Sequence, residues 1–194
     1  MKFTKLKIQD AWLAESAVLR DNRGSFTEWF KFDDFSNTSG IEFSTKQANF
    51  SISDKGVIRG IHYSLSPDGQ AKWIKCVAGS VIDFVVDIRP NSSNFMKVIE
   101  IDLNASDGKA VFIGPGLGHG FISLEDHSAV SYLLSSPYSP NYEFEINPLD
   151  EELKINWHLN LVDDIGIIRS PKDAQAPSIR ERMDQGKLPF IKNR

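Results

Sequence analysis

Short apolar segments that alternate between two faces recur along this chain, and a turn signal ends each of them. The clearest is VIDFVVDI at residues 81–88, where the even-numbered side chains fall on one face of a strand and the odd-numbered ones on the other. It follows KWIKCV at 72–77, and we expect Ala-Gly-Ser at 78–80 to join the two strands in a tight hairpin. The pattern limits the chain to a β-rich fold.

The same pattern continues on both sides of this pair. We expect further strands at 49–53, 57–63, 96–103, 110–113, 120–124 and 129–134. The first two of these are expected to pair across the turn at 54–56. Helical periodicity is scarce, and only 33–37 and 148–153 favour short helices, the second beginning at Pro148. The prediction is an all-β fold, a sandwich or barrel of the jelly-roll type, with a few short helices.

Composition narrows the class of protein further. A chain of 194 residues suits one domain, whose segment from about residue 163 onward either packs on the barrel or trails as an arm. The single cysteine, Cys76, excludes an internal disulfide and a multi-cysteine metal site. Because the net charge is −4 and no basic run occurs, nucleic acid is not an expected partner. The N-terminus lacks the apolar stretch of a signal peptide, and no apolar run approaches the roughly 18 residues of a membrane span. We therefore expect a cytoplasmic protein with no membrane partner.

Two of the four histidines stand out because each lies near glycine in a strand-like segment. His62 occurs in IRGIHY and His119 in GLGHGF. Either could be a structural histidine of the core, but two such sites in one barrel favour a pocket. Arg59 precedes His62 by three residues, so in a regular strand their side chains would point to opposite faces. They can share one site only if Gly60 permits a bulge or ends the strand; otherwise Arg59 is a surface or interface residue.

Two more residues have plain structural explanations. Tyr132 shares a strand face with Val130 and Leu134, which favours a core tyrosine whose hydroxyl finds a partner. Lys72 opens its strand and would ordinarily be solvated. The glycine-rich segment GPGLGHG at 114–120 lacks the glycine spacing, the lysine–serine pair and the following helix of a phosphate-binding loop. We interpret it as a tight turn that enters a strand.

The longer motifs, taken in order, resemble those of the dTDP-4-dehydrorhamnose 3,5-epimerase family, the cupin-type sugar-nucleotide epimerases. The resemblance runs from about residue 5 to residue 177, nearly the whole chain. The matching motifs are DNRGSFTEWF at 21–30, QANFS at 47–51, GVIRGIHYSL at 56–65, QAKWIKCVAGSVIDFVVDIRPNSSNF at 70–95, GPGLGHGFISLED at 114–126, YLLSSPYSP at 132–140 and IIRSPKDAQAP at 167–177. No single motif is decisive, but together they are specific.

The resemblance implies one cupin-type jelly-roll domain over residues 1–194 and an enzyme that epimerises a dTDP-4-keto-6-deoxyhexose without a metal or another cofactor. It implies that His62 is the general base, that Asp173 orients this base, that Tyr132 donates a proton and that Lys72 lies near the C4 oxygen. The substrate-binding positions would be Arg23, Glu28, Gln47, Asn49, Arg59, His119, Tyr138, Glu143 and Lys172.

The family resemblance also bears on assembly. It implies a homodimer with exchanged N-terminal strands, in which Arg23 and Glu28 reach across from the neighbouring subunit. The segment from about 163 to 194 would then pack on the barrel. The nucleotide-sugar would be the only other partner.

The residue types fit the chemistry of a 4-keto sugar. C3 and C5 both flank the C4 ketone, so loss of a proton from either carbon leaves a resonance-stabilised enolate. A histidine with a carboxylate partner suits the base near neutral pH, and a tyrosine starts protonated as the acid. A lysine would stabilise the enolate oxygen, and arginines would hold the diphosphate.

Several positions depart from the family pattern. Ala48 and Phe50 replace an acid and a histidine, Gly118 stands where alanine is usual, and Pro137 replaces a tyrosine. These departures affect substrate identity more than catalysis, and they leave an epimerase acting at one carbon, or a non-catalytic sugar-nucleotide binding protein, as alternatives. A metal-dependent cupin is a third alternative, although Tyr63 and Ser64 follow His62 where such cupins carry a second histidine.

Overall fold

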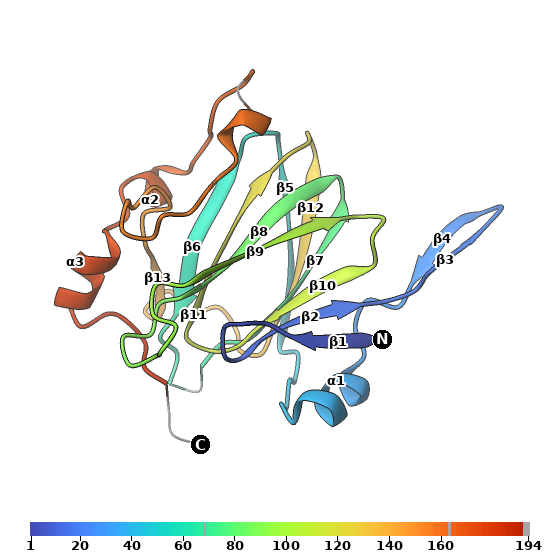
Figure 1. The fold of residues 1–194 in the computed structure, drawn as a ribbon, viewed down its shortest axis with the longest axis horizontal. Coiled ribbons are helices and arrows are strands. Elements are labelled where there is room, and N and C mark those ends of the chain that lie inside the picture. Colours follow the sequence, from blue (N-terminus) through green and yellow to red (C-terminus); the bar gives the residue numbers. More distant parts are fainter. Residues whose placement is uncertain (68, 163, 192–194) are drawn as a thin grey trace.

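Thirteen strands form two packed antiparallel sheets and a separate hairpin in the described part of the chain (Figure 1). The structure is a computed structural model that describes residues 1–67, 69–162 and 164–191. The six-stranded sheet has the order β1 (Lys2–Lys5), β2 (Ala11–Glu15), β10 (Lys109–Ile113), β7 (Lys72–Ala78), β12 (Ser128–Leu134) and β5 (Gln47–Ser53). The five-stranded sheet has the order β13 (Glu143–Glu145), β6 (Ile58–Ser64), β11 (Leu117–Ser123), β8 (Ser80–Asp87) and β9 (Val98–Asn104). The mainly β prediction is confirmed, and this is the cupin-type jelly-roll fold.

From β5 to β12, successive strands lie in opposite sheets, except β8 and β9, which pair with each other. β5 and β6, β7 and β8, β9 and β10, and β11 and β12 each divide in this way. The expected hairpin at 78–80 and the expected pairing of 49–53 with 57–63 are therefore wrong. Both turns exist, but each carries the chain across the barrel to the opposite sheet. The reason is that apolar side chains cover both faces of each sheet. The two strands on either side of each of these turns are therefore held together by packing across the barrel and not by pairing with each other.

Three apolar clusters account for this packing. The barrel interior is filled from both sheets, and its buried members include Ile74, Cys76, Val81, Val85, Val111, Phe121 and Val130. The outer face of the five-stranded sheet is covered by the C-terminal part of the chain, with Phe84, Val86, Trp157, Ile179 and Leu188 among its buried residues. The outer face of the six-stranded sheet packs under a helix through Phe35, Phe43, Trp73 and Phe112. The alternation predicted for 81–88 is thus confirmed, with one face of β8 inside the barrel and the other outside it.

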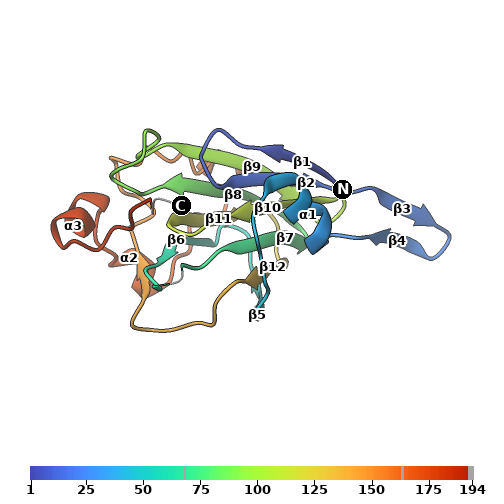
Figure 2. The same ribbon diagram turned by 90° about the horizontal axis from the view of Figure 1, so that it is seen from below.

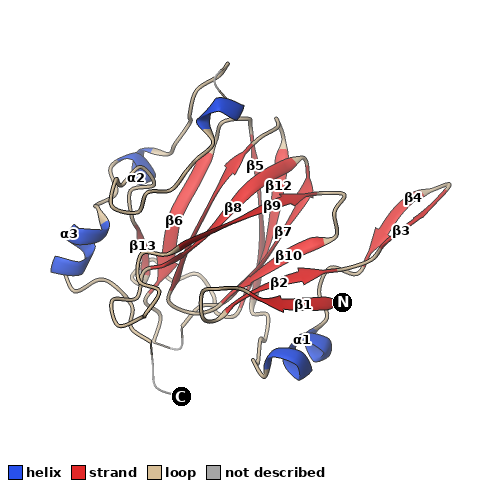
Figure 3. Ribbon diagram, in the orientation of Figure 1, coloured by secondary structure: helices blue, strands red, loops and turns tan. Residues whose placement is uncertain are grey.

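Helices are few and lie at the periphery (Figure 3). They are α1 (Phe32–Ser39), the 3₁₀ turn η1 (Leu159–Leu161), α2 (Pro171–Ala174) and α3 (Ile179–Asp184). The helix expected at 33–37 is confirmed, but the one expected at 148–153 is wrong. That segment forms two successive turns, in which the amide of Asp150 donates to the carbonyl of Asn147 and the amide of Leu153 to that of Asp150. No helix among the described residues is long and apolar enough to cross a membrane.

The C-terminal segment contacts the five-stranded sheet along most of its described length. The hydroxyl of Tyr63 donates to the carbonyl of Lys187 at 2.8 Å, and Arg182 binds both the backbone and the carboxylate of Glu145. Residues 163 and 192–194 of the predicted segment lie outside the described residues. α2 and α3 are thereby held beside β6 and β13.

The hairpin of β3 (Val18–Asp21) and β4 (Gly24–Thr27) stands apart from both sheets. It projects from the barrel at the end opposite α3, as Figures 1 and 2 show from two directions. Leu19 and Phe26 on this hairpin are 62% and 67% exposed. Such large exposed apolar side chains on a two-stranded ribbon indicate a surface made for contact with another molecule.

Candidate active site

Polar side chains replace apolar ones on the inward face of several strands at one end of the barrel. Lys72 lies on the face of β7 that carries Ile74 and Cys76, and His119 lies between the interior residues Leu117 and Phe121 of β11. Asp83 of β8 and Tyr132 of β12 follow the same rule, with Val81 and Val130 as their interior neighbours. The strand period of two thus brings side chains that are far apart in the sequence into one place.

Lys72, His119 and Tyr132 line a cavity of about 650 Å³ between the two sheets, and Asp83, which does not line it, contacts His119. Nine predicted site residues line it together with others: Asn49, Arg59, His62, Lys72, His119, Tyr132, Tyr138, Glu143 and Lys172. Asp173 lines it as well and completes the set of four predicted catalytic residues. A cavity of this size with a few convergent polar groups is typical of a small-molecule site.

A bulge in β6 lets Arg59 and His62 share this cavity. His119 of β11 pairs with His62 and Phe121 pairs with Arg59, so two residues of β6 stand opposite the single residue Gly120. The Gly60–Ile61 peptide bond is cis, and Gly60 has a φ of 134°. A side chain at Gly60 would lie 2.6 Å from the Cα atom of Gly120. Glycine is therefore required where the bulge reverses the parity of the strand.

His62 is held by a carboxylate from the C-terminal segment. Its Nε2 atom lies 2.7 Å from Oδ1 of Asp173, and the side chains are 40% and 5% exposed. Burial alone would raise the pKa of the Asp173 carboxyl, but its hydrogen bonds to His62, to the Gly60 amide and to Ser170 outweigh burial and lower the pKa. The carboxylate is thus ionised, and it orients an imidazole that solvent or a ligand can reach.

The position of Asp173 follows from a short capped helix. Ser170 is the N-cap of α2, and its hydroxyl accepts a hydrogen bond from the Asp173 amide at 3.0 Å. Pro171 occupies the first turn, where its missing N–H costs nothing. The sequence SPKD therefore fixes the aspartate on a rigid turn above β6.

Tyr132 combines both sequence interpretations, because it packs beside buried residues and also lines the cavity. Its hydroxyl lies 3.1 Å from Oγ of Ser51 on the neighbouring strand β5. Burial raises the pKa of the Tyr132 phenol well above its usual value. The group is therefore a proton donor that starts protonated at neutral pH.

Lys72 is not the solvated strand end that its position in the sequence indicates. Its side chain is 8% exposed, and Nζ donates to the carbonyl of His62 at 3.4 Å. Burial lowers the pKa of the Lys72 ammonium group, and the charges of Glu143 and Asp83 oppose this effect. The correction has a plain cause: β7 is central in its sheet, so its first residue already lies inside the barrel.

The remaining predicted contacts differ in how directly they reach the cavity. Nε and one terminal nitrogen of Arg59 donate to Oγ of Ser53 and to the carbonyl of Ile52, at 3.0 and 3.1 Å. Gln47 does not line the cavity, but its amide nitrogen donates to Asn49 at 2.9 Å and its amide oxygen accepts from the Tyr138 backbone at 2.8 Å. Gln47 therefore orders two lining residues rather than facing the cavity itself.

Arg23 and Glu28 do not line this chain's own cavity. Both are exposed, and Arg23 at the tip of the β3–β4 hairpin forms an ion pair with Asp21. The prediction that they act across a subunit boundary remains a prediction.

Several residues in or behind the cavity were not predicted from the sequence. Gln70, Ser51, Arg169 and Ser170 line it, and Asp83 contacts the lining residue His119. Only Asp83 could have been noticed, as an acid at an inward position of an otherwise apolar strand. The others are ordinary polar residues whose role depends on pairing between distant segments.

The described part of the chain contains no cluster of side chains that would support metal binding. No group of three or more histidine, cysteine, aspartate or glutamate side chains there is arranged to hold a metal ion. His62 and His119 each use Nε2 for an aspartate, and these are two different aspartates.

Comparison with known proteins points to one family. The family model described as dTDP-4-dehydrorhamnose 3,5-epimerase matches residues 5–181. A protein of Mycolicibacterium smegmatis named dTDP-4-dehydrorhamnose 3,5-epimerase is 40% identical over 189 residues, which are 97% of this chain and 91% of that protein.

Two solved structures share the fold over nearly the whole chain. NovW, a 4-keto-6-deoxy sugar epimerase from the novobiocin biosynthetic gene cluster of Streptomyces spheroides, is 36% identical with a TM-score of 0.93, and the match covers 98% of this chain and 94% of that one. ChmJ, a 3'-monoepimerase from Streptomyces bikiniensis solved in complex with dTDP-quinovose, is 39% identical with a TM-score of 0.89 and coverage of 95% and 91%.

Proposed function

Because this chain belongs to the dTDP-4-dehydrorhamnose 3,5-epimerase family and is a carbohydrate epimerase of deoxysugar biosynthesis, we propose that it acts on a dTDP-4-keto-6-deoxyhexose. The reaction would invert C3, C5 or both through an enolate intermediate. The observation that carries the proposal is the His62–Asp173 pair at 2.7 Å, in the same cavity as the protonated phenol of Tyr132.

In the first step His62 removes the proton from a carbon beside the C4 ketone. The electron pair of the broken C–H bond forms the C=C bond of the enolate, and the negative charge moves to the C4 oxygen. Asp173 holds the imidazole in place and stabilises the imidazolium that forms. Because the His62 side chain is 40% exposed, it can exchange its proton with water between turnovers.

In the second step Tyr132 returns a proton to the carbon. Inversion results when this proton arrives on the face opposite His62, and β12 carries Tyr132 from the sheet opposite to the one that carries His62. The two steps leave His62 with one proton more and Tyr132 with one proton fewer, so His62 releases a proton to water and the tyrosinate takes one up before the next turnover. Ser51 lies within hydrogen-bond distance of the hydroxyl and holds it in position.

Lys72 supplies the positive charge for the enolate. A buried ammonium group beside the C4 oxygen stabilises the charge where it develops, and water does not screen it there. The proposal needs no redox step, because the substrate and the product are isomers.

The nucleotide would bind toward the open side of the cavity. Arg59, Arg169 and Lys172 line the cavity and are available for the diphosphate, and Tyr138 supplies an exposed aromatic ring. Lys172 lies 2.8 Å from the Glu145 carboxylate. In the proposal, Lys172 binds a phosphate oxygen, either after leaving Glu145 or while still in contact with it. Asn49 and Glu143 line the same cavity and would complete the polar contacts.

The active form proposed is a homodimer with exchanged N-terminal strands. Two observations support it: β5 is the edge strand of its sheet, with Phe50 and Ile52 exposed, and the β3–β4 hairpin projects with Leu19 and Phe26 exposed. A hairpin from a second copy laid along β5 would cover both apolar surfaces and pair the open edge. It would also bring Arg23 and Glu28 to a cavity that they do not reach in their own chain.

Product analysis tests the proposed function. The enzyme is incubated with dTDP-4-keto-6-deoxyglucose, the 4-keto products are trapped by reduction, and NMR coupling constants give the configuration at C3 and C5. Inversion at both carbons identifies the two-carbon activity, and inversion at C3 or C5 alone identifies the one-carbon alternative. Tight binding without inversion or solvent exchange at either carbon would leave a sugar-nucleotide binding protein and contradict the proposal.

A further inference from the structure

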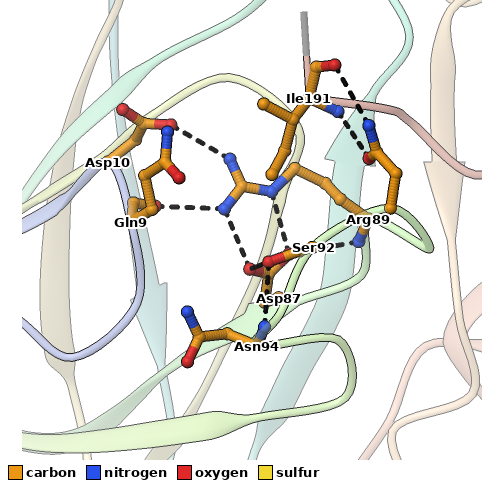
Figure 4. A network of polar contacts seen from close by, with 8 residues as sticks. Gln9, Asp10, Asp87, Arg89, Ser92, Asn94 and Ile191 are labelled. Atoms are coloured by element: carbon orange, nitrogen blue, oxygen red, sulfur yellow. Dashed lines mark hydrogen bonds and ion pairs between the residues drawn. The ribbon is translucent and has the colours of Figure 1, made fainter.

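Two buried arginines each tie one segment of the chain to another. Arg89 donates to both carboxylate oxygens of Asp87 at 2.8 and 2.9 Å, and Ser92 donates to the same carboxylate at 2.6 Å (Figure 4). The Arg89 guanidinium also binds the Asp10 carboxylate at 3.0 Å and the carbonyl of Gln9, so this network joins the N-terminal turn to the end of β8. None of these five residues lines the cavity of the candidate active site, and the network serves the fold.

The second buried arginine, Arg182 of α3, lies beside the cavity. Its Nε atom donates to the carbonyl of Glu145 at 2.8 Å, and one terminal nitrogen donates to Oε1 of the Glu145 carboxylate at 3.0 Å. The other terminal nitrogen donates to Gln185 at 3.2 Å. The Cζ atom of Arg182 lies 5.4 Å from the centre of the Phe144 ring, and Phe144 lines the cavity. Contacts to both its backbone and its carboxylate therefore hold Glu145 in one orientation.

The other carboxylate oxygen of Glu145 faces the site. Oε2 lies 2.8 Å from Nζ of Lys172, a residue of α2 that lines the cavity. The contact is an ion pair without the angles of a hydrogen bond, and the buried Oε2 atom has no hydrogen-bond partner among the described residues. A buried carboxylate needs a compensating charge, and Lys172 supplies it on this side.

Four residues form a closed ring at this point: His62, Glu145, Lys172 and Asp173. Glu145 and His62 are direct partners in the pairing of β13 with β6, so their side chains lie on the same face of the sheet. Lys172 and Asp173 are neighbours in α2. Among the described residues, α2 makes two side-chain contacts at ion-pair distance with this sheet, one by Lys172 to Glu145 and one by Asp173 to His62. The helix that carries the partner of the proposed base is thus tied to the sheet a second time, one residue away.

Backbone hydrogen bonds hold the chain on either side of α2. The amide of Ile58 donates to the carbonyl of Ile168 at 2.8 Å, and the amide of Asn147 donates to the carbonyl of Pro177 at 2.9 Å. Between these points, no backbone–backbone hydrogen bond of the described residues joins 169–176 to a strand. The orientation of α2 on the sheet therefore depends on its side-chain contacts.

We propose that Glu145 is a positioning residue of the epimerisation. Arg182 holds the carboxylate of Glu145, and that carboxylate holds Lys172. The α2 turn is thereby fixed with Asp173 on the imidazole of His62, and the ion pair stays in place when the diphosphate binds. An ammonium group has three N–H donors, so Lys172 can contact the carboxylate and a phosphate oxygen together. The inference rests on the proposed function, and its basis is that a displacement of about 1 Å at a catalytic group can cost about 10²-fold in rate.

A test that needs no turnover follows the backbone amides of residues 173–175, each of which is hydrogen-bonded within the α2 turn. Their exchange with solvent is measured by NMR in the wild type, Glu145→Gln and Asp10→Asn. Glu145→Gln keeps a side-chain oxygen for Arg182 but removes the ion pair with Lys172, so exchange of these amides should become about tenfold faster.

Asp10→Asn is the matched control for this experiment. Asp10, like Glu145, contacts a buried arginine at 3.0 Å, and the two side chains are 16% and 13% exposed. Asp10 does not line the cavity of the candidate active site. Asp10→Asn should therefore lower the Tm by an amount similar to that of Glu145→Gln, but leave the exchange of the α2 amides unchanged.

Steady-state kinetics supply the second readout. In Glu145→Gln, kcat for inversion should fall by about tenfold or more without a loss of dTDP affinity, whereas Asp10→Asn should keep the wild-type kcat. Lys172→Met removes the same ion pair from its other side, so its kcat at saturating substrate should fall by a similar factor. The double variant should be no slower than Lys172→Met alone, because one contact is lost in both. Rate losses that multiply in the double variant would overturn the proposal.

The two readouts separate this inference from the proposed function. Unchanged exchange of the α2 amides in Glu145→Gln would overturn the inference, whether or not the wild type turns over the sugar. Faster exchange with an unchanged kcat would leave Glu145 a residue of the fold and would also overturn it. Faster exchange in Glu145→Gln, with no turnover in the wild type, would support the tie between Glu145 and α2 and refute the proposed substrate.

A second variant serves if Glu145→Gln does not fold. The Lys172 side chain is 59% exposed, so Lys172→Met leaves the buried contact of Glu145 with Arg182 in place. It should make the exchange of the α2 amides faster by about the same factor. Unchanged exchange in Lys172→Met would overturn the proposal.

Discussion

The imidazole of His62 and the carboxylate of Asp173 meet at 2.7 Å although 111 residues separate them in the chain. One comes from a bulged strand inside the barrel and the other from a capped turn of helix in the C-terminal segment. The proposed base is therefore assembled only when the C-terminal segment is docked on the five-stranded sheet.

Replacing Asp173 by asparagine should impair chemistry more than binding. The amide keeps the shape of the side chain but no longer stabilises an imidazolium, so kcat should fall by about 10²–10⁴-fold. Affinity for dTDP, measured by calorimetry, should change little, because the nucleotide lies toward other residues. A variant with normal kcat and weakened dTDP binding would remove Asp173 from the role of orienting the base.

The same substitution should show a pH-dependent effect on stability. The folded-state pKa of Asp173 is lowered, so its contribution is complete above the unfolded-state value of about 3.9 and is lost as the pH falls through the folded-state value. The difference in Tm between wild type and Asp173→Asn should therefore be largest near neutral pH and should shrink below about pH 4. A difference that grows in acid would contradict the lowered pKa.

Tyr132→Phe should separate deprotonation from inversion. His62 can still remove a proton and return a deuteron on the same face, so C–H exchange in deuterated water should persist while epimer formation falls by about 10²-fold or more. ¹H NMR measures both in one sample. Ser51→Ala is the matched control, because it removes the partner of the hydroxyl but not the hydroxyl, and should retain inversion at a reduced rate. Equal loss of exchange and inversion in Tyr132→Phe would assign the tyrosine a different role.

Gly60→Ala should destabilise the protein by about 3–5 kcal/mol, since a Cβ atom would meet the Gly120 backbone at 2.6 Å in a conformation that L residues rarely adopt. Gly186→Ala, at a positive φ but with nothing within 4 Å, should cost only about 1–2 kcal/mol. Chemical denaturation gives both values. Equal costs would mean that the close approach of β6 and β11 at the bulge does not matter.

Mixing two inactive variants tests the shared site. His62→Ala has a defective cavity and an intact hairpin, whereas Arg23→Ala has the reverse, so a mixed dimer contains one complete site. Refolding them together in equal amounts should restore about a quarter of wild-type activity, because half the dimers are mixed and one of their two sites is whole. His62→Ala mixed with Asp173→Asn should restore nothing, since both defects lie in the same cavity. No restoration in the first mixture would place Arg23 outside the partner's site.

The sequence predicted the eight strands β5 to β12, because they show a local period of two or an apolar run between turn signals, but it did not predict β1 to β4 or β13. It could not decide whether Arg59 and His62 share a face, since that depends on a bulge set by the opposing residue Gly120. Lys72 was placed in solvent by its position at a strand end, and burial by neighbouring strands overrode that expectation. The hairpin at 78–80 failed for a related reason: a tight turn is visible in the sequence, but the sheet that the next strand joins is not.

Contacts across long separations were the least predictable from residue types alone. Asp173 was named through the family resemblance, not through any local pattern, and Asp83 was placed on a strand face but not named as a site residue. Both act on histidines in other segments, so their roles appear only when the strands and the C-terminal segment are in place.

The most direct test of the account is the fate of the protons at C3 and C5 of dTDP-4-keto-6-deoxyglucose in deuterated water. The wild type should replace at least one of them with deuterium, and His62→Ala should lose this exchange by about 10²-fold or more while still binding dTDP. Exchange at wild-type rate in His62→Ala, or none at either carbon in the wild type, would contradict the claim that this cavity makes an enolate with His62 as its base.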